Sequence, residues 1–242
     1  MIELIDVHKR LGSRQILDGM TFEVPNGLNY VLMGPSGTGK SVTLKHVIGI
    51  FRPDSGQVRV DGKDVPGMSR DELMALRKRM GYLFQNGALI NWLTVFDNVA
   101  LPLREHGLLP RAERGDRVAE VLELVGLSHA SAQFPPDISG GMKLRAGLAR
   151  ALVTKPEYVL YDEPNAGLDP IISQQIHELI AEVRDTLNVT GLIVTHSRAC
   201  ATQCGDRIGI IKDGKIAVEG TVEEMLASED ELATAFLGEG SD

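Results

Sequence analysis

Cysteine is nearly absent from this chain of 242 residues, which contains only Cys200 and Cys204. A spacing of four places both on one face of a helix, where a disulfide is poorly oriented, and no His/Cys cluster with zinc-ligand spacing accompanies them. We therefore expect two reduced thiols, as is typical of a protein in a reducing compartment.

Long apolar runs and a basic surplus are also missing. No run approaches the roughly 20 residues that a membrane span needs. The opening MIELIDVHKR lacks the basic-then-apolar order of a signal peptide. The net charge is −8, whereas broad nucleic-acid binding usually requires a basic face. We expect a cytoplasmic chain that does not bind nucleic acid.

The chain does contain enough apolar residues, 43%, for one sizeable core or a core with a smaller lobe. Strand-like segments separated by turns occupy the first third, and helix-like spacing follows at 42–48 and 71–80; the strand-like segments are IELIDV, MTFEV, LNYVLMG and QVRVDG. Strand and helix signals alternate again after residue 139, through YVLYDE and GLIVTH, and a hairpin, RIGIIKDGKIAVEG, precedes a short helical tail. This alternation predicts an α/β fold with a parallel sheet covered on both faces.

Strand signals vanish between about residues 93 and 134. RVAEVLELVGL has helix-like spacing, and Pro135-Pro136 ends the region. We therefore expect a single domain, 1–242, in which a helical subdomain at 87–137 interrupts a core made of 1–86 and 138–242.

The strongest chemical signal is GPSGTGKS, between a predicted strand and a predicted helix, which fits the phosphate-binding loop pattern G-x-x-x-x-G-K-[ST]. Its glycines let successive N–H groups point at an anion near the positive end of the following helix. We expect Lys40 to reach the β- and γ-phosphates and Ser41 to bind Mg²⁺. The predicted nucleotide-binding residues here are Gly34, Pro35, Ser36, Gly37, Thr38, Gly39, Lys40, Ser41 and Val42.

YVLYDE brings two carboxylates to the end of a buried strand, where open α/β sheets bind ligands. Alone, such a pair is an ordinary loop or helix start. Beside a phosphate loop, Asp162 can hold the Mg²⁺ shell and Glu163 can accept a proton from an attacking water.

ISGGM opens a helix with a Ser N-cap followed by bare glycines, which makes a second anion site in one chain. One nucleotide triphosphate does not need two such sites within one subunit. The second site has a use if it closes over the nucleotide that a partner subunit binds.

In order and spacing, these motifs resemble those of the ATP-binding subunits of ABC transporters over nearly the whole chain. The resemblance implies a P-loop NTPase fold, with a RecA-like parallel core, an antiparallel β subdomain and a helical ABC subdomain. It also implies ATP and Mg²⁺ as cofactors and a head-to-tail homodimer. Gln85 then senses Mg²⁺ and water, and His196 contacts the γ-phosphate. Ser139, Gly140 and Gly141 contact the partner's γ-phosphate, and Asp169 lies at the dimer seam.

Within that family, four segments are similar to the MlaF/Mkl-type ATPases of Mla/Mce phospholipid transport: GKSVTLKH, MSRDELMALRKRMGYLFQNGAL, TVFDNVALPLREH and SGGM. This implies a membrane permease and an Mce-domain lipid-binding protein as partners, and a place on the inner membrane face. Two alternatives stay open: another cargo, such as amino acids or lipoproteins, and a soluble ABC ATPase without a transport role.

Three positions depart from the family pattern. Met142 stands where Gln is usual, Val42 follows Ser41 where a hydroxyl residue is common, and Leu11 replaces an aromatic that stacks on adenine. Recognition at the family's signature, here ISGGM, then rests on Ser139 and main-chain amides, and the preference for ATP over GTP is less strict.

GALINWLTVF, from Gly87 to Phe96, contains the only tryptophan. Part of this run can be ordinary core. An amphipathic Trp among apolar neighbours is also the composition of an interface anchor. By resemblance, Ala88, Leu89, Ile90 and Trp92 line the surface that receives a cytoplasmic helix of the permease.

Overall fold

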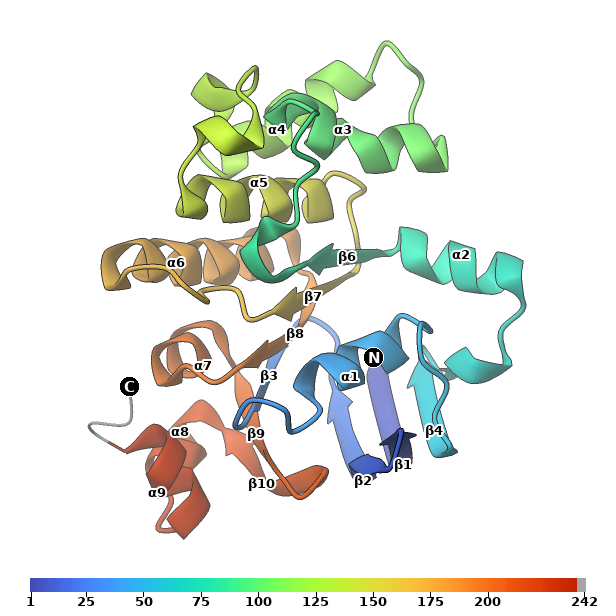
Figure 1. Cartoon of the computed structure of the whole chain (residues 1–242), viewed down its shortest axis with the longest axis vertical. Helices are drawn as coiled ribbons and strands as arrows, with labels where there is room; N and C mark the ends of the chain where they lie inside the picture. Colours follow the sequence, from blue (N-terminus) through green and yellow to red (C-terminus); the bar gives the residue numbers. More distant parts are fainter. Residues whose placement is uncertain (239–242) are drawn as a thin grey trace.

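Two β-sheets organise the chain, whose computed structural model describes residues 1–238 (Figure 1). The larger sheet has the strand order β10-β9-β3-β8-β7-β6, in which only β10 runs antiparallel to its neighbour. Its strands are β3 (Asn29–Met33), β6 (Met80–Leu83), β7 (Tyr158–Asp162), β8 (Thr190–Thr195), β9 (Arg207–Lys212) and β10 (Lys215–Thr221). Every residue of β3 and β8 is buried, as expected of a sheet covered on both faces.

The smaller sheet is antiparallel, with the order β2-β1-β4-β5. Its strands are β1 (Ile2–Leu11), β2 (Arg14–Val24), β4 (Ser55–Val60) and β5 (Lys63–Asp64). Apolar side chains such as Leu4 and Met20 join Leu32 and Leu160 of the larger sheet in one buried cluster. The predicted fold class is confirmed by this architecture.

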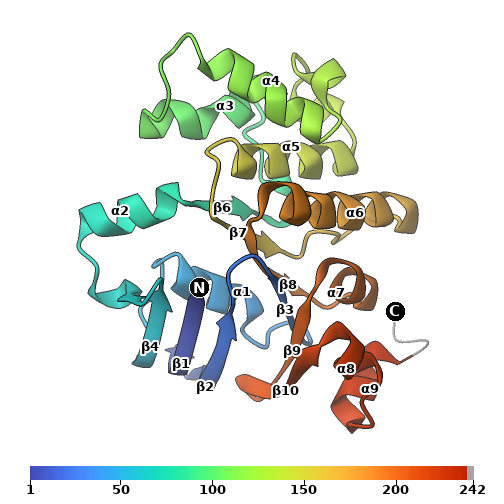
Figure 2. The same cartoon turned by 180° about the vertical axis from the view of Figure 1, so that it is seen from behind.

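Helices lie around the larger sheet in Figure 1. They are α1 (Lys40–Val47), α2 (Arg70–Lys78), α3 (Val95–His106), α4 (Arg114–Leu124), α5 (Gly140–Leu152), α6 (Pro170–Leu187), α7 (Arg198–Cys204), α8 (Val222–Leu226) and α9 (Glu231–Leu237). Short 3-10 turns occupy Val65–Gly67, Gln85–Gly87, Ser128–Ala130 and Pro135–Asp137. In both views, α3 and α4 form an outer layer at the top of the molecule (Figures 1 and 2).

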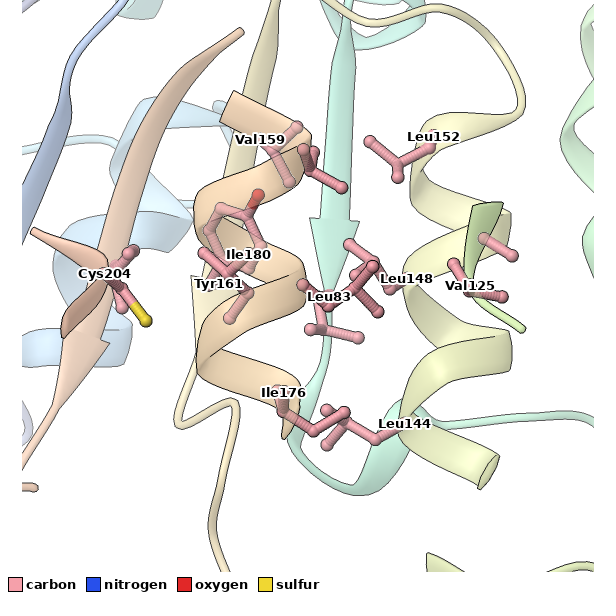
Figure 3. Packing of buried hydrophobic residues seen from close by; sticks show 14 of the residues in the cluster. Leu83, Val125, Leu144, Leu148, Leu152, Val159, Tyr161, Ile176, Ile180 and Cys204 are labelled. Atoms are coloured by element: carbon pink, nitrogen blue, oxygen red, sulfur yellow. The ribbon is translucent and has the colours of Figure 1, made fainter. Parts of the chain in front are cut away.

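Helix α5 lies between this outer layer and the sheet. It packs on α3 and α4 on one side and on β6 and α6 on the other. Figure 3 shows Leu148 of α5 beside Leu83 of β6, and Ile176 of α6 beside Leu144. The core and the helical layer therefore share one apolar cluster, and a subdomain boundary at residue 137 remains our proposal.

One expectation from the pattern is wrong. The helix expected at 71–80 ends at Lys78, and Met80 already belongs to β6, a strand that we did not expect. MGYL is too short to show the periodicity of apolar residues that marks a helix or a strand, and only its pairing with β7 makes it a strand.

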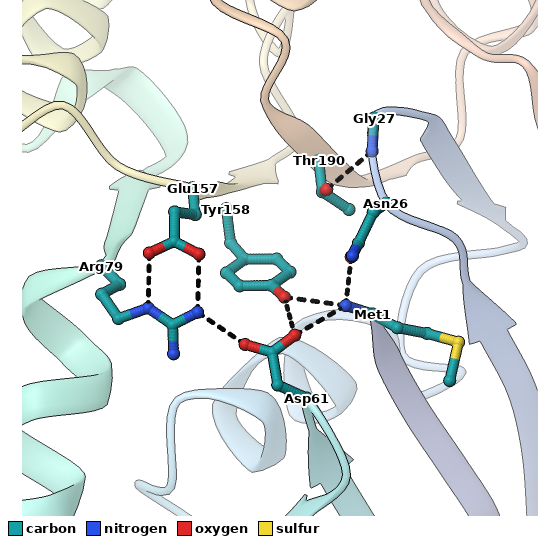
Figure 4. Close-up of polar contacts among 8 residues, drawn as sticks. All are labelled: Met1, Asn26, Gly27, Asp61, Arg79, Glu157, Tyr158 and Thr190. Atoms are coloured by element: carbon teal, nitrogen blue, oxygen red, sulfur yellow. Dashed lines mark hydrogen bonds and ion pairs between the residues drawn. The ribbon is translucent and has the colours of Figure 1, made fainter.

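An ionic network joins the two sheets (Figure 4). Arg79 donates to both carboxylate oxygens of Glu157, at 2.6 Å each, and to Asp61 at 2.6 Å. Tyr158 at the start of β7 donates to Asp61 in the turn after β4, and the Met1 amino group also donates to Asp61, at 2.9 Å. Burial raises the pKa of Asp61, but these donors outweigh it and bring the pKa to about 2.

Helix α7 carries both cysteines, each buried and free, as expected. Within residues 1–238, none of the helices combines the length and apolar character that crossing a bilayer requires.

Candidate active site

The phosphate loop lies between the end of β3 and the start of α1, where the sequence placed it. Gly39, the N-cap of α1, has φ 104°, and a Cβ there would stand 2.8 Å from a methyl carbon of Leu17. Only glycine satisfies both the left-handed backbone and that contact. The Thr38 hydroxyl closes the turn by donating to the Pro35 carbonyl at 2.8 Å.

Lys40 directs its ammonium into this loop. Its Nζ donates to the carbonyls of Gly34, at 2.7 Å, and Pro35, at 3.1 Å. It also forms an ion pair with Glu163, 3.3 Å from Oε1, although the Lys40 side chain is only 6% exposed. A cation this well buried at the head of a helix attracts anionic ligands.

Asp162 and Ser41 meet across the end of β7. The Ser41 hydroxyl donates to Oδ1 of Asp162 at 2.7 Å, and the Tyr82 hydroxyl donates to Oδ2 at 3.0 Å. Burial, and then the Asp162 charge, raises the pKa of Tyr82, so the phenol stays a donor. A hydroxyl and a carboxylate are the hard oxygen ligands that Mg²⁺ prefers, with phosphate oxygens and water completing the shell.

Glu163 is held from two sides. Its Oε1 faces Lys40, and its Oε2 lies 2.8 Å from Nδ1 of His196 and 3.3 Å from the His196 backbone N–H. Glu163 has φ 50°, and its own N–H donates to Val194 at 2.9 Å. Left-handed backbone at a residue with a side chain is uncommon, and it is typical of positions where function fixes the geometry.

A cavity of about 430 Å³ brings most of the predicted groups together. Lys40, Ser41, Gln85, Glu163 and His196 line it, along with Ser36, Gly37, Gly39 and Val42 of the loop. Two further lining residues, Arg14 and Ile16 of β2, were not predicted from the sequence. Tyr82, which contacts Asp162, was not predicted either. Leu11, placed by resemblance where adenine stacks, is 39% exposed and does not line the cavity.

The signature residues form a separate group outside this cavity. Ser139 caps α5 by accepting the Met142 N–H at 3.3 Å, and Asp169 caps α6 by accepting the N–H groups of the first turn at 3.0 Å. A Cβ on Gly141 would stand 2.5 Å from a methyl carbon of Ile172, so the two helix starts pack tightly. Ser139, Gly140 and Asp169 are exposed.

A larger hollow, about 600 Å³, lies at the opposite ends of the strands, near Asn26, Tyr158 and Thr190. It contains none of the predicted catalytic groups. The chemistry of its lining residues, and not its volume, makes the 430 Å³ cavity the candidate active site.

The apolar run after Gln85 divides between core and surface. Trp92 is 80% exposed, whereas Leu89 and Phe96 pack on the buried cluster. The fully buried Asn98, which the sequence did not single out, accepts the Ile90 N–H and donates to the carbonyls of Ile90, Leu93 and Thr94. A side-chain amide therefore fixes the loop that presents Trp92.

Comparisons with known proteins identify the family of the chain. The family model described as "ABC transporter" matches residues 17–166. The "Intermembrane phospholipid transport system ATP-binding protein MlaF" of Escherichia coli is 40% identical over 98% of this chain and 88% of its own length. Its Haemophilus influenzae counterpart is 41% identical over 100% of this chain and 92% of its own length. The "Probable ribonucleotide transport ATP-binding protein mkl" of Mycobacterium leprae is 42% identical over 98% and 68%.

Solved structures resemble the chain over most of its length. A post-hydrolysis dimer of the ATP-binding cassette MJ0796, bound to ADP and Pi, superposes with a TM-score of 0.83 at 31% identity, covering 92% of this chain and 99% of that one. The structure of cbiO1 from Clostridium perfringens, part of an ABC transporter complex, superposes with a TM-score of 0.86 at 28% identity. It covers 94% of this chain and 91% of that one. The chain therefore belongs to the ABC transporter family, as an ATP-binding subunit that hydrolyses ATP.

Proposed function

We propose that the 430 Å³ cavity holds the triphosphate and that Glu163 is the general base of hydrolysis. The Glu163 carboxylate takes a proton from a water as the water oxygen attacks the γ-phosphorus. The bond from the γ-phosphorus to the bridging oxygen breaks, and ADP leaves. His196 keeps Oε2 oriented through the 2.8 Å contact. Lys40 stabilises the developing negative charge, and catalysis is positioning plus electrostatics.

Mg²⁺ bound by Ser41 and Asp162 would neutralise phosphate charge. The fit rests on their paired oxygens, 2.7 Å apart at the mouth of the loop. Gln85 lines the same cavity and is the third residue that we assign to the metal and its water. No group of three or more His, Cys, Asp or Glu in residues 1–238 could hold a metal ion, so substrate phosphates and water have to supply most of the shell.

The active unit is a head-to-tail homodimer. Ser139 and Gly140 are exposed and lie outside the cavity of their own subunit, which suits residues that act on a partner's nucleotide. Asp169 is exposed beside them. The dimeric form of the MJ0796 cassette supports this arrangement.

The cargo that we propose is phospholipid, and the task is maintenance of outer-membrane lipid asymmetry. The observation that carries this is similarity to the MlaF proteins over 88–92% of their length. The complex would include a membrane permease and an Mce-domain lipid-binding protein, with this chain at the cytoplasmic face of the inner membrane. The mkl relatives are named for ribonucleotide transport, so a different cargo is the second candidate.

The permease docks, in our proposal, beside the exposed edge of β6. A groove of about 180 Å³ runs there between β6, α3 and α5, and Phe84, Pro102 and Arg150 are among its lining residues. Residues 88–92 continue from this strand, and Ala88 and Trp92 are exposed. Leu89 and Ile90 are partly buried, so we assign the anchor role mainly to Trp92.

Glu163→Gln tests the hydrolytic assignment. Loss of a general base typically slows reactions about 10²- to 10⁴-fold, while binding persists. We expect that loss in phosphate release, together with an ATP-stabilised dimer in size exclusion. Glu182→Gln, on the exposed face of α6, is the matched control. Normal turnover with only monomer in Glu163→Gln would show that Glu163 is not the base.

Co-purification of the chain with its permease tests the cargo. Mass spectrometry of the detergent-extracted complex should find phospholipid retained in it. Retention of a nucleotide other than ATP or ADP, with phospholipid only at the level of a control membrane protein, would favour the second candidate.

A further inference from the structure

Three consecutive left-handed residues follow Gln85. Asn86, Gly87 and Ala88 have φ values of 59°, 74° and 43°. Glycine adopts this conformation freely, but for a residue with a Cβ, such as Ala88, it is unfavourable. A turn of this kind persists where surrounding contacts over-determine it.

Those contacts come from α5. Arg150 donates from Nη1 to the Ala88 carbonyl, at 2.9 Å, and from Nη2 to the Gly87 carbonyl, at 2.8 Å. Below the guanidinium, two backbones touch: a Cβ on Gly147 would stand 2.8 Å from the Gly87 Cα, and a Cβ on Gly87 would stand 2.3 Å from the Lys143 carbonyl oxygen. The turn is thus seated directly on the helix.

The guanidinium has little else to compensate its charge. It is partly buried, and burial lowers the pKa of Arg150. Within residues 1–238, its hydrogen bonds go to backbone carbonyls and it forms no ion pair with a carboxylate. The two carbonyls of the turn are the acceptors that stabilise it. A charge-assisted, two-pronged contact of this kind is stronger and more directional than neutral hydrogen bonds.

The two ends of this connection have different roles in the proposed function. Gln85, directly before the turn, lines the nucleotide cavity. Helix α5 begins at Gly140, directly after Ser139, and continues without a break to Leu152. A continuous helix transmits displacement along its length because its hydrogen bonds and packing resist bending.

We propose that Arg150 is a positioning residue, which fastens the 86–88 turn to α5 so that Gln85 and Ser139 of one subunit move together. Displacement of Gln85 at the γ-phosphate of its own subunit then displaces the signature that faces the partner's nucleotide. This proposal rests on the proposed homodimer. Because Arg150 also lines the groove beside β6, a segment docked there would contact the same side chain.

Three variants of the full chain test whether Arg150 holds the 86–88 turn on α5: Arg150→Ala, Arg150→Lys and Gly147→Ala. Lysine keeps the charge but loses the fork that bridges two carbonyls. Gly147→Ala pushes the turn away without changing Arg150. The matched control is Arg145→Ala, because Arg145 lies on the same helix and donates to the Val125 carbonyl at 3.2 Å, away from the turn.

We expect Arg150→Ala to bind ATP within about threefold of wild type and to lose about 10- to 100-fold in kcat, as misplacement by about 1 Å far from the chemistry can do. Gly147→Ala should show the same split between kcat and affinity, and Arg150→Lys should fall between. In a Glu163→Gln background, Arg150→Ala should abolish the ATP-dependent dimer. Arg145→Ala should keep wild-type kcat and that dimer.

A merely structural role predicts a different pattern. If Arg150→Ala and Arg145→Ala lower the melting temperature alike and kcat per folded molecule stays at the wild-type level, the proposal is wrong. It is also wrong if Gly147→Ala folds and hydrolyses ATP normally. Failure of wild type and Arg145→Ala to hydrolyse ATP would instead refute the proposed function.

Discussion

Removing the indole of Trp92 should lower the folding stability of the isolated subunit only slightly but should weaken its binding to the permease strongly. Trp92 is 80% exposed. A fully buried Trp removes about 150–250 Å² from water, so the buried fifth corresponds to about 30–50 Å². At about 25 cal/mol per Å², Trp92→Ala destabilises the folded chain by about 1 kcal/mol. In a domain of this size that lowers the melting temperature by about 2–4 °C.

If the permease covers the remaining four fifths of the indole, about 120–200 Å² more is buried. That area contributes at most about 3–5 kcal/mol to the binding free energy. Interface anchors commonly lose about 2 kcal/mol or more on truncation. We therefore expect Trp92→Ala to reduce co-purification with the permease and to uncouple transport, while the subunit still folds and binds ATP.

Differential scanning fluorimetry and pull-down from detergent extracts measure the two effects. Leu103→Ala is the contrast, because this α3 residue is buried and such a truncation typically costs about 2–5 kcal/mol of stability. A melting temperature that falls as far in Trp92→Ala as in Leu103→Ala would refute our reasoning about Trp92. Unchanged co-purification would refute the docking assignment.

Four further substitutions test other parts of the structure. Lys40→Ala removes a charge-assisted phosphate contact worth about 1.5–3 kcal/mol, so ATP should bind at least about tenfold more weakly by calorimetry, and an unchanged affinity would refute the assignment. Met142→Gln should keep most ATPase activity because Ser139 caps the helix through the Met142 backbone N–H, whereas Ser139→Arg should abolish it; equal losses would give the Met142 side chain a specific role. Asp61→Asn should destabilise the fold at pH 7. The pKa of Asp61 is lower in the folded state than its unfolded value of about 3.9, so the ionised carboxylate stabilises the fold at every pH above that value. The loss of stability should shrink as the pH falls toward about 2, and a loss that does not depend on pH would exclude the carboxylate charge as its cause.

The chemistry-bearing motifs were readable from the sequence because each is local. The phosphate loop needs its glycines and Lys40 within a few consecutive residues, and β7 delivers Asp162 directly at its end. The long apolar strands and the 117–127 helical pattern also follow from periodicity over short windows. MGYL was missed because its strand character comes from pairing with β7.

Only the tertiary structure decided which distant segments meet. Arg14 and Ile16 lie on a strand of the smaller sheet, and no motif marks them, yet sheet packing brings them to the cavity that we propose for the nucleotide. Arg150 looks like an ordinary last-turn cation of α5 until its guanidinium is seen on the 86–88 turn, 62 residues from Ala88 in sequence. Local sequence fixes backbone preference and chemical type. Burial, pairing order and contacts between distant residues are properties of the packed chain, because they depend on which surfaces exclude water together.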